Sequence, residues 1–482
     1  MFIKEIKIKN FRLFPADTCF EINTFNVPNG EDEGTGINLF VGENGLGKTT
    51  LLDALALPLL SYKAENFTLD DFNDPNKETL IEIFSEHDFE FAGIFPKTKY
   101  KAKGFSFEAK IRSRGAKTYL SSTVINDQKY IKADNQKNPK EESPDLRTNV
   151  NNPFIGNRFN ENDILFLDRN RIYQIRSGMY SATRFDRLME DFNYQYIKKE
   201  NNPFDINNQL QSISDDMENS FLNKAIDKFQ EISGIELSVC FLNNWKPYEK
   251  AFFSMLKENK QQIPLERLGA GYEMIFSLLY SFFLSQQSNK QLIILIDEPE
   301  LHLHPKLQGD FVKVLLEFSK SAQIFLTTHS PLLVKQFLYN KKISPHCLVK
   351  ESEQVKEVGM KDSVLKYLSA NEINYIAFGL ATEEYHNELY NKLEADFWND
   401  SKNIKTVKEN DYPNNIGRQI IFDNEFFNKQ KGESIDSPFR QGKNKVTRHT
   451  YIRNKIHHSE ENEGFPSHEE LGESIKKLRT FF

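Results

Sequence analysis

A glycine-rich turn near the N-terminus has the residue types and spacing that bind a triphosphate. Residues 42–49 read Gly-Glu-Asn-Gly-Leu-Gly-Lys-Thr and satisfy the pattern G-x-x-x-x-G-K-[ST]. In this pattern backbone N–H groups surround the phosphates of ATP, the lysine bridges the β- and γ-phosphates, and the last hydroxyl coordinates Mg²⁺. The predicted nucleotide-binding residues are Gly42, Asn44, Gly45, Gly47, Lys48, Thr49 and Thr50, with Thr49 also a metal ligand.

Two acidic residues end an apolar run much later in the chain. Residues 293–296 are Ile-Ile-Leu-Ile, and Asp297 and Glu298 follow directly. A buried strand of this form projects carboxylates at its C-terminal end, where Asp297 would join the Mg²⁺ shell and Glu298 would orient or deprotonate the attacking water. His329 follows a second apolar run and is predicted to hydrogen-bond the γ-phosphate. Glu298 and His329 are therefore the candidate catalytic pair.

The elements that must position these residues indicate an α/β fold. Residues 2–8 alternate as a strand, residues 37–41 form a short apolar strand before the glycine turn, and a helix is expected over 50–55. Strands over 292–296 and 324–327 carry the acidic pair and the histidine. Antiparallel strands are expected over 96–130, with turns at Gly104 and Gly115.

Length and composition exclude several classes of protein. The 482 residues carry 69 acidic and 62 basic side chains, and the net charge of −7 argues against a simple basic nucleic-acid coat. No apolar run approaches the ~20 residues that span a bilayer. The three cysteines are widely spaced and form no CxxC pair, so neither a disulfide framework nor a zinc ribbon is indicated. We expect a cytoplasmic protein without a membrane segment.

Together, the segments GENGLGKTT, LIDEPELHLHP and TTHSP resemble the ABC-type ATPases of the overcoming-lysogenization-defect and structural-maintenance-of-chromosomes group. This resemblance implies a head-to-tail homodimer, or a higher oligomer, in which a signature segment of one protomer closes the nucleotide site of the other. Residues 268–273 stand in the signature place, so Gly269 and Gly271 are the candidate contributors. The usual signature serine is replaced by Gly269, which favours slow hydrolysis or ATP held as a structural ligand.

Two further features of this resemblance leave alternatives open. The family places a glutamine in the loop that leads to the helical insert, and Arg169, Arg171 and Gln174 are the candidates here. His302 and His304 alternate after Glu300 and could be metal ligands, but in the resembling family this stretch runs along the dimer interface. A solvated or packed loop is the third interpretation.

The C-terminal region resembles bacterial antiphage ATPases such as the PtuA subunit of Septu, to which some retron-associated ATPases are related. The resemblance implies an ATPase that controls a separately encoded nuclease, of the HNH type in Septu. Arg453 and His458 also fit the R-N-x-x-x-H pattern of HEPN ribonucleases, although a basic helix that packs or docks a partner fits them too. Asp396 and Asp400 lack a strand-borne glutamate partner, so DNA cleavage by this chain is not expected.

Two basic stretches are candidate interaction surfaces. Residues 97–117 carry eight basic side chains and one acid, and alternation puts Lys97, Lys99, Lys101 and Lys103 on one strand face. Such a stripe could contact nucleic acid or could be an ordinary solvated edge strand. Residues 440–458 carry six Lys or Arg and no acid, which makes them a candidate partner dock.

The sequence thus predicts an α/β P-loop ABC-type ATPase head with an antiparallel β subdomain, a short helical insert and a mostly helical C-terminal domain. The expected boundaries are 1–176 for the first lobe, 177–261 for the insert, 262–350 for the second lobe and 351–482 for the tail. The expected function is ATP-dependent dimerisation in antiphage defence that controls an effector nuclease. The alternatives are a self-contained HEPN-like ribonuclease and a DNA-repair ATPase.

Overall fold

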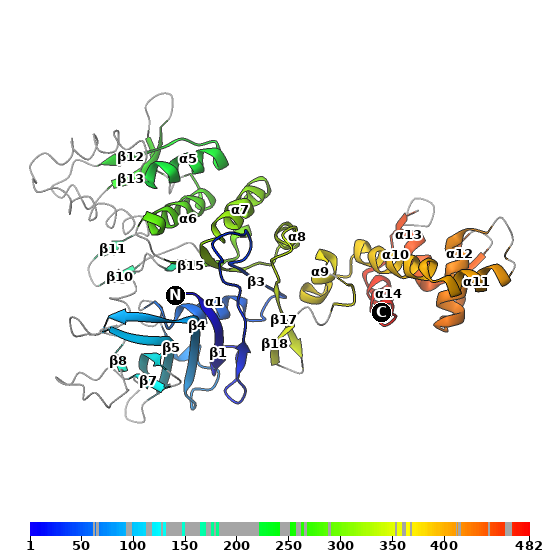
Figure 1. Ribbon diagram of the computed structural model, residues 1–482, viewed down its shortest axis with the longest axis horizontal. Helices are drawn as coiled ribbons and strands as arrows, with labels where there is room; N and C mark the ends of the chain where they lie inside the picture. Colours follow the sequence, from blue (N-terminus) through cyan, green and yellow to red (C-terminus); the bar gives the residue numbers. More distant parts are fainter. Residues whose placement is uncertain are drawn as a thin grey trace, which may run out of the picture. The chain divides into compact units, whose positions relative to one another are not determined.

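The computed structural model divides into two compact units, residues 1–357 and 358–482. Figure 1 shows their elements along the chain. The residues that the structure describes are 1–60, 63, 67–92, 99–111, 118–126, 129–131, 147–149, 164–169, 175–177, 180–182, 221–241, 251–256, 262–264, 268–287, 291–351, 354–358, 363–366, 369–410, 412, 416–441, 444–457 and 465–482.

A six-stranded sheet in the order β18-β17-β3-β16-β15-β9 is the centre of the first unit. Its strands β3, β9, β15, β16 and β17 pair in parallel. Every residue of β3, β9, β15 and β16 is buried, which explains their continuous apolar sequences. The bounds are β3 Ile37–Gly42, β9 Ile164–Leu167, β15 Leu292–Asp297, β16 Ala322–Thr327, β17 His346–Glu351 and β18 Gln354–Val358.

Helices cover both faces of this sheet. In Figure 1, α6 and α7 lie on one side of the sheet and α1 on the other. The helix α6 packs against α5, where the rings of Phe229 and Phe276 meet edge to face at 5.7 Å. The bounds are α1 Lys48–Ala56, α5 Phe221–Ser233, α6 Ala270–Gln287, α7 Pro305–Phe318 and α8 Pro331–Leu338.

An antiparallel sheet in the order β2-β1-β4-β5-β6-β7, with β8 paired to β6, forms the β subdomain. The prediction of a turn at Gly104 is wrong, because Gly104 lies inside β5 and pairs with Phe84 and Ile125. A Cβ at Gly104 would lie 1.9 Å from the Ile83 carbonyl oxygen, so the glycine allows a close backbone approach rather than a turn. Gly115 lies outside the described residues. The bounds are β1 Ile3–Lys9, β2 Phe20–Ile22, β4 Thr79–Ala92, β5 Lys99–Ile111, β6 Thr118–Asn126, β7 Lys129–Ile131 and β8 Arg147–Asn149.

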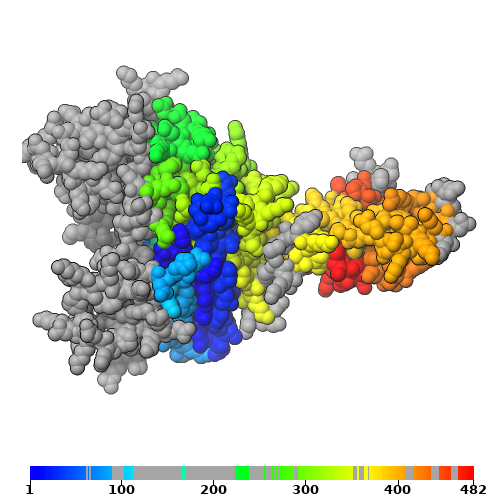
Figure 2. Space-filling model, in the orientation of Figure 1, coloured from blue at the N-terminus to red at the C-terminus, as the bar shows by residue number. Residues whose placement is uncertain are grey.

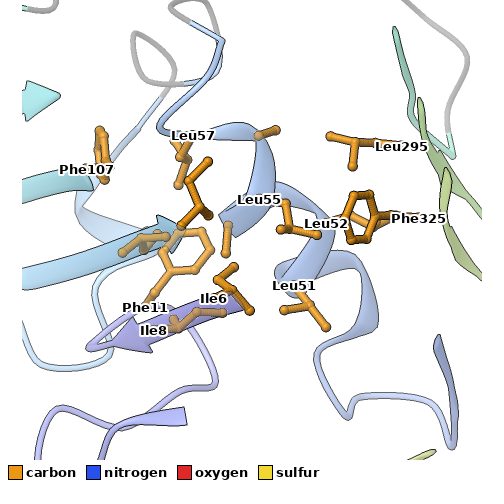
Figure 3. Packing of buried hydrophobic residues seen from close by; sticks show 14 of the residues in the cluster. Ile6, Ile8, Phe11, Leu51, Leu52, Leu55, Leu57, Phe107, Leu295 and Phe325 are labelled. Atoms are coloured by element: carbon orange, nitrogen blue, oxygen red, sulfur yellow. The ribbon is translucent and has the colours of Figure 1, made fainter. Parts of the chain in front are cut away.

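The core of the first unit joins the two sheets through α1. Figure 3 shows leucines of α1 between the antiparallel strands and the parallel sheet, with Leu52 beside Phe325. Leu51, Leu52 and Leu55 are fully buried. Burial of each such side chain contributes about 1.5–3 kcal/mol, so the helix that opens after the glycine turn is held rigidly.

Segments from the two ends of the first unit lie side by side. The amide nitrogen of Ile3 donates to the Gln323 side chain at 2.7 Å, and the Asn340 side chain donates to the Glu33 carbonyl at 2.9 Å. Figure 2 shows the same neighbourhood at the surface, where the N-terminal residues in blue border later residues in yellow-green. One lobe is therefore assembled from both early and late sequence.

The region expected as a helical insert is only partly described. It contains α5 and the antiparallel strands β12 Leu237–Phe241 and β13 Ala251–Leu256. The third strand of this small sheet is β14 Gln262–Pro264, and a separate hairpin is formed by β10 Ile175–Ser177 and β11 Tyr180–Ala182.

The second unit is mostly helical and has its own core. The side chains of Ser369 and Thr382 cap α9 and α10. Among the helices that the structure describes, none has the length and apolar character needed to cross a bilayer. The bounds are α9 Ala370–Phe378, α10 Glu383–Asn399, α11 Ser401–Glu409, α12 Arg418–Phe422, a π-helical turn Asp423–Gln430, β19 Ile435–Gln441, β20 Asn444–Thr447, α13 Arg448–His457 and α14 His468–Arg479.

Candidate nucleotide-binding site

The glycine turn lies between the buried strand β3 and the start of α1. Gly47 precedes α1 with a left-handed backbone, φ 83°, which a side-chain-bearing residue rarely adopts. The first N–H groups of a helix have no acceptor within the helix, and the helix dipole adds positive potential there. The turn therefore presents donors to an anion at the carboxyl edge of the sheet.

Lys48 is folded back onto the turn. Its ammonium donates to the carbonyl oxygens of Gly42 at 2.7 Å and Glu43 at 2.8 Å, and the residue is 4 % exposed. Burial lowers the pKa of Lys48 to about 8, although the carboxylates of Glu298 and Asp297 act in the opposite direction. The lysine is thus held beside the turn by acceptors that phosphate oxygens could replace.

Thr49 and Asp297 meet although they are far apart in the chain. The Thr49 hydroxyl lies 3.0 and 3.1 Å from the two Asp297 carboxylate oxygens, and Thr327 donates to one of them at 2.5 Å. Burial raises the pKa of Asp297, while the hydroxyl bonds lower it. A buried carboxylate beside a hydroxyl is an oxygen donor set that suits Mg²⁺, so these two residues fit the predicted metal site.

Glu298 and His329 form the second half of the site. The His329 Nε2 atom lies 3.1 Å from a Glu298 carboxylate oxygen. Burial and the nearby Lys48 ammonium lower the pKa of His329, so the ring is neutral at pH 7 and donates through Nε2. Glu298 has a left-handed backbone, φ 44° and ψ 62°, and its amide donates to Thr327. Strain of this kind costs about 1–3 kcal/mol and is characteristic of functional sites.

Glu300 positions the loop that carries His329. Its Oε1 atom accepts from the His329 amide at 2.6 Å and from the Thr328 hydroxyl at 2.9 Å. Burial raises the pKa of Glu300. The sequence interpretation considered this glutamate only together with the neighbouring histidines and missed the contact, because the two partners are separated by a helix and a strand.

A cavity of about 620 Å³ joins these groups. Its lining includes eight of the predicted nucleotide-binding and catalytic residues, together with Arg169 and Glu300. Gly42 and Asp297 contact Lys48 and Thr49 of its wall by hydrogen bonds. Leu13, Leu301 and Ser330 were not predicted. The lining residues are Leu13, Asn44, Gly45, Gly47, Lys48, Thr49, Thr50, Arg169, Glu298, Glu300, Leu301, His329 and Ser330.

His302 and His304, which follow Glu300, form hydrogen bonds with different partners. His302 Nε2 lies 2.7 Å from the Arg169 carbonyl oxygen, whereas His304 Nδ1 accepts from the Lys306 amide at 3.3 Å and caps α7. Among the residues that the structure describes, no group of three His, Cys, Asp or Glu side chains is arranged to hold a metal ion. Three residues were candidates for the position of the family's glutamine. Of these, Arg169 lines the cavity, whereas Arg171 and Gln174 lie outside the described residues.

The two signature glycines differ in exposure. Gly269 is exposed, with φ 122° and open space around its Cβ position, whereas Gly271 is buried in α6. A Cβ at Gly271 would lie 2.4 Å from the His302 carbonyl oxygen of the same chain. Gly269 is therefore the one available to a neighbouring molecule.

The predicted residues outside the first unit's cavity are only partly described. Arg453 is half-buried on α13 and its Nη1 atom donates to the Asn454 side chain at 3.3 Å, while His458 lies outside the described residues. Lys97 and the side chains of Lys99 and Lys101 also lie outside the part of the chain that the structure describes.

A glycine turn after the parallel strand β3, with an acidic pair at the end of β15, two strands away in the same sheet, defines a P-loop ATPase. The family model for the AAA ATPase domain matches residues 1–334, which is more than half of the chain. The chain belongs to this family.

Similar proteins confirm the resemblance to the Septu and overcoming-lysogenization-defect group. Endonuclease GajA of Bacillus cereus is 22% identical and OLD nuclease of Thermus scotoductus is 22% identical, covering 70% and 68% of this chain. The chain spans 59% of the length of each of these two relatives. Septu protein PtuA of Bacillus mycoides is 22% identical over 62% of this chain and 34% of that protein.

Solved structures that this chain matches include an Smc head bound to the C-terminal winged-helix domain of ScpA. It has a TM-score of 0.47 and 15% identity, and the match covers 74% of this chain and 98% of that one.

Proposed function

We propose that this chain is an ATP-binding ABC-type ATPase of an antiphage defence system, and that it dimerises around nucleotide and controls a separately encoded nuclease. One observation carries the ATPase assignment: Lys48, Thr49, Glu298 and His329 line a single cavity, although they come from three distant parts of the chain. The family match supports nucleotide binding independently.

Each residue at the site has a proposed task. The turn and Lys48 bind the phosphates, Glu298 orients a water molecule and takes its proton, and His329 donates to the γ-phosphate. Water then attacks the γ-phosphorus, the bond to the β–γ bridging oxygen breaks, and ADP and inorganic phosphate are released. Thr49 and Asp297 would hold Mg²⁺, which supplies charge neutralisation of the phosphates when bound.

The expected hydrolysis is slow or conditional. In the signature segment Gly269 offers a backbone N–H but no hydroxyl, so one contact to the transition state across the dimer is absent from the proposed mechanism. Its exposure and the open space around it support a role in the neighbour's site. Leu301, which is 57% exposed at the rim of the cavity, is a second candidate for the same interface.

Control of a nuclease is supported by the relatives. Two of them are named as nucleases, and a third is the PtuA protein of Septu. The resemblance of the tail to Septu ATPases favours a separate nuclease of the HNH type as the partner, docked on the second unit. The same resemblance also implies that the chain could belong to a retron, since some retrons are accompanied by related ATPases.

Two substitutions test the ATPase assignment. Lys48→Ala should weaken ATP binding at least tenfold because a buried phosphate contact is lost, and Glu298→Gln should bind ATP normally but stall before hydrolysis. Calorimetric titration and phosphate release measure these effects, and light scattering should detect an ATP-dependent dimer of Glu298→Gln. Lys313→Ala, which removes a 78% exposed surface lysine on α7, is the matched control. Wild-type behaviour of both site variants would refute the role assignments.

The partner assignment needs a separate experiment. The chain should copurify with a nuclease encoded beside it, and ATP should change the nuclease activity of the complex. RNA degradation by the chain alone, lost in Arg453→Ala, would instead favour the ribonuclease alternative. ATPase activity stimulated by DNA ends would favour the DNA-repair alternative.

A further inference from the structure

Arg169 is placed beside Glu298 by the register of two parallel strands. β9 pairs with β15 so that Leu167 aligns with Ile296. Arg169 lies two residues after Leu167, and Glu298 lies two residues after Ile296. Both residues therefore lie at the same edge of the sheet, at the same level. An exposed arginine therefore stands at the carboxyl edge of the sheet, where ligands of parallel sheets bind.

His302 holds the backbone of Arg169 in this place. The contact between His302 Nε2 and the Arg169 carbonyl oxygen is 2.7 Å long. Because a carbonyl only accepts, the ring must carry its proton on Nε2. The turn after the acidic strand thus fixes the end of β9, and His302 acts as a positioning residue rather than a metal ligand.

The Arg169 side chain has a weak partner and room to move. Its Nη1 atom lies 3.8 Å from a Glu298 carboxylate oxygen, and the side chain is 55% exposed while that of Glu298 is 10% exposed. Charge-assisted hydrogen bonds are about 2.7–2.9 Å long, so this pair is not closed. Arg169 also lines the cavity, together with Lys48, Thr49 and His329.

We propose that Arg169 binds the γ-phosphate and so distinguishes ATP from ADP; this inference rests on the proposed function. A γ-phosphate carries more negative charge than a carboxylate and offers the guanidinium two oxygens in one plane, so it should displace the loose Glu298 contact. ADP offers no such group, and Arg169 then stays on Glu298. With ATP bound, the Glu298 carboxylate is released from the arginine and can take a proton from water.

The ratio of two affinities tests this proposal. Arg169→Ala should weaken ATP binding about tenfold and change ADP binding less than about twofold, as expected for loss of one charge-assisted contact to the γ-phosphate. Calorimetric titration with each nucleotide and Mg²⁺ measures both constants. Arg169→Lys should recover part of the ATP affinity, and Lys313→Ala is the control for loss of a surface cation.

The outcomes separate this inference from the ATPase assignment. Equal affinities for ATP in Arg169→Ala and wild type, or equal losses for ATP and ADP, would overturn the role of Arg169. Failure of the wild-type chain to bind either nucleotide would instead refute the proposed function.

The positioning role of His302 has its own readout. His302→Ala should lower the ATP-to-ADP affinity ratio in the same direction as Arg169→Ala, because the backbone of Arg169 loses its donor. His302→Gln keeps an N–H donor and should restore most of the ratio. If the ATP-to-ADP affinity ratio of His302→Ala equals that of wild type, His302 does not position Arg169.

Discussion

At the scale of residues, buried charged groups prepare the site for a triphosphate. The Lys48 ammonium donates to the neutral carbonyls of Gly42 and Glu43, and these hydrogen bonds are less favourable than contact with an anion. Asp297 is a buried carboxylate held by hydroxyls. A cation beside Asp297 and phosphates beside Lys48 would relieve both burial costs at once.

The lowered pKa of Lys48 predicts a pH dependence of ATP binding. Because its pKa is about 8, Lys48 is charged below pH 8 and becomes neutral above it in the free protein. ATP affinity should therefore be constant below pH 8 and should fall by up to about tenfold per pH unit above it. Titrations between pH 7 and 9.5 measure this slope. Lys48→Arg keeps its charge throughout, and an equally steep fall in that variant would contradict the explanation.

At the scale of elements, α6 is fixed to the turn that follows the acidic pair. Gly271 allows this contact because its Cβ position is 2.4 Å from the His302 carbonyl oxygen. His302 in turn holds Arg169 at the end of β9. The start of α6, the acidic strand and β9 are thus linked by direct contacts, so a movement of α6 in a dimer would reach Arg169 and Glu298.

A methyl group at Gly271 should break this packing. In Gly271→Ala the new Cβ would overlap backbone that cannot rotate away, and we expect the free energy of unfolding to fall by about 1–3 kcal/mol. Gly309→Ala is the matched control, since Gly309 lies inside α7 and its Cβ position has 3.9 Å to the nearest atom. Alanine there should be neutral or stabilising. Urea unfolding measures both, and equal stabilities would contradict the packing argument.

At the scale of the whole molecule, each of the two units has its own apolar core. Both units also bury polar groups. In the second unit, His386 Nε2 and His449 Nδ1 both contact the Ser474 hydroxyl, at 2.9 and 2.7 Å. Burial lowers the pKa of each histidine to about 3, so both are neutral when the unit is folded.

These histidines predict that the second unit loses stability in acid. Their pKa values are lower in the folded than in the unfolded chain, so the stabilisation is complete above about pH 6.5 and decreases as the pH falls toward 3. Each histidine should remove about 1.4 kcal/mol per pH unit in this range. Hydrogen exchange in α10 and α14 between pH 7 and 5, corrected for intrinsic rates, measures the loss.

A surface histidine of the second unit provides the control for this prediction. His468 is exposed at the start of α14, so His468→Ala should leave the pH dependence unchanged. His386→Gln, whose side chain does not titrate, should reduce the slope by about half, because one of the two protons is removed. A slope equal to that of wild type in His386→Gln would exclude the buried pair as its source.

The sequence by itself determined the local parts of this protein. The strand, glycine turn and helix around Lys48 and the acidic end of the strand at Asp297 follow from periodicity and backbone chemistry over a few residues. The family resemblance rested on the same short motifs, and the fold class followed from them. Such patterns can be recognised from the sequence because their physical cause lies within one helix, strand or turn.

Only the tertiary structure decided which distant residues meet. Thr49 reaches Asp297, Glu300 holds His329, and Arg169 faces Glu298 because parallel strands from three parts of the chain end at one edge in a particular register. Gly104 looked like a turn but serves a close approach between strands, which depends on a partner strand. Register and backbone proximity are properties of paired segments, so no single stretch of sequence contains them.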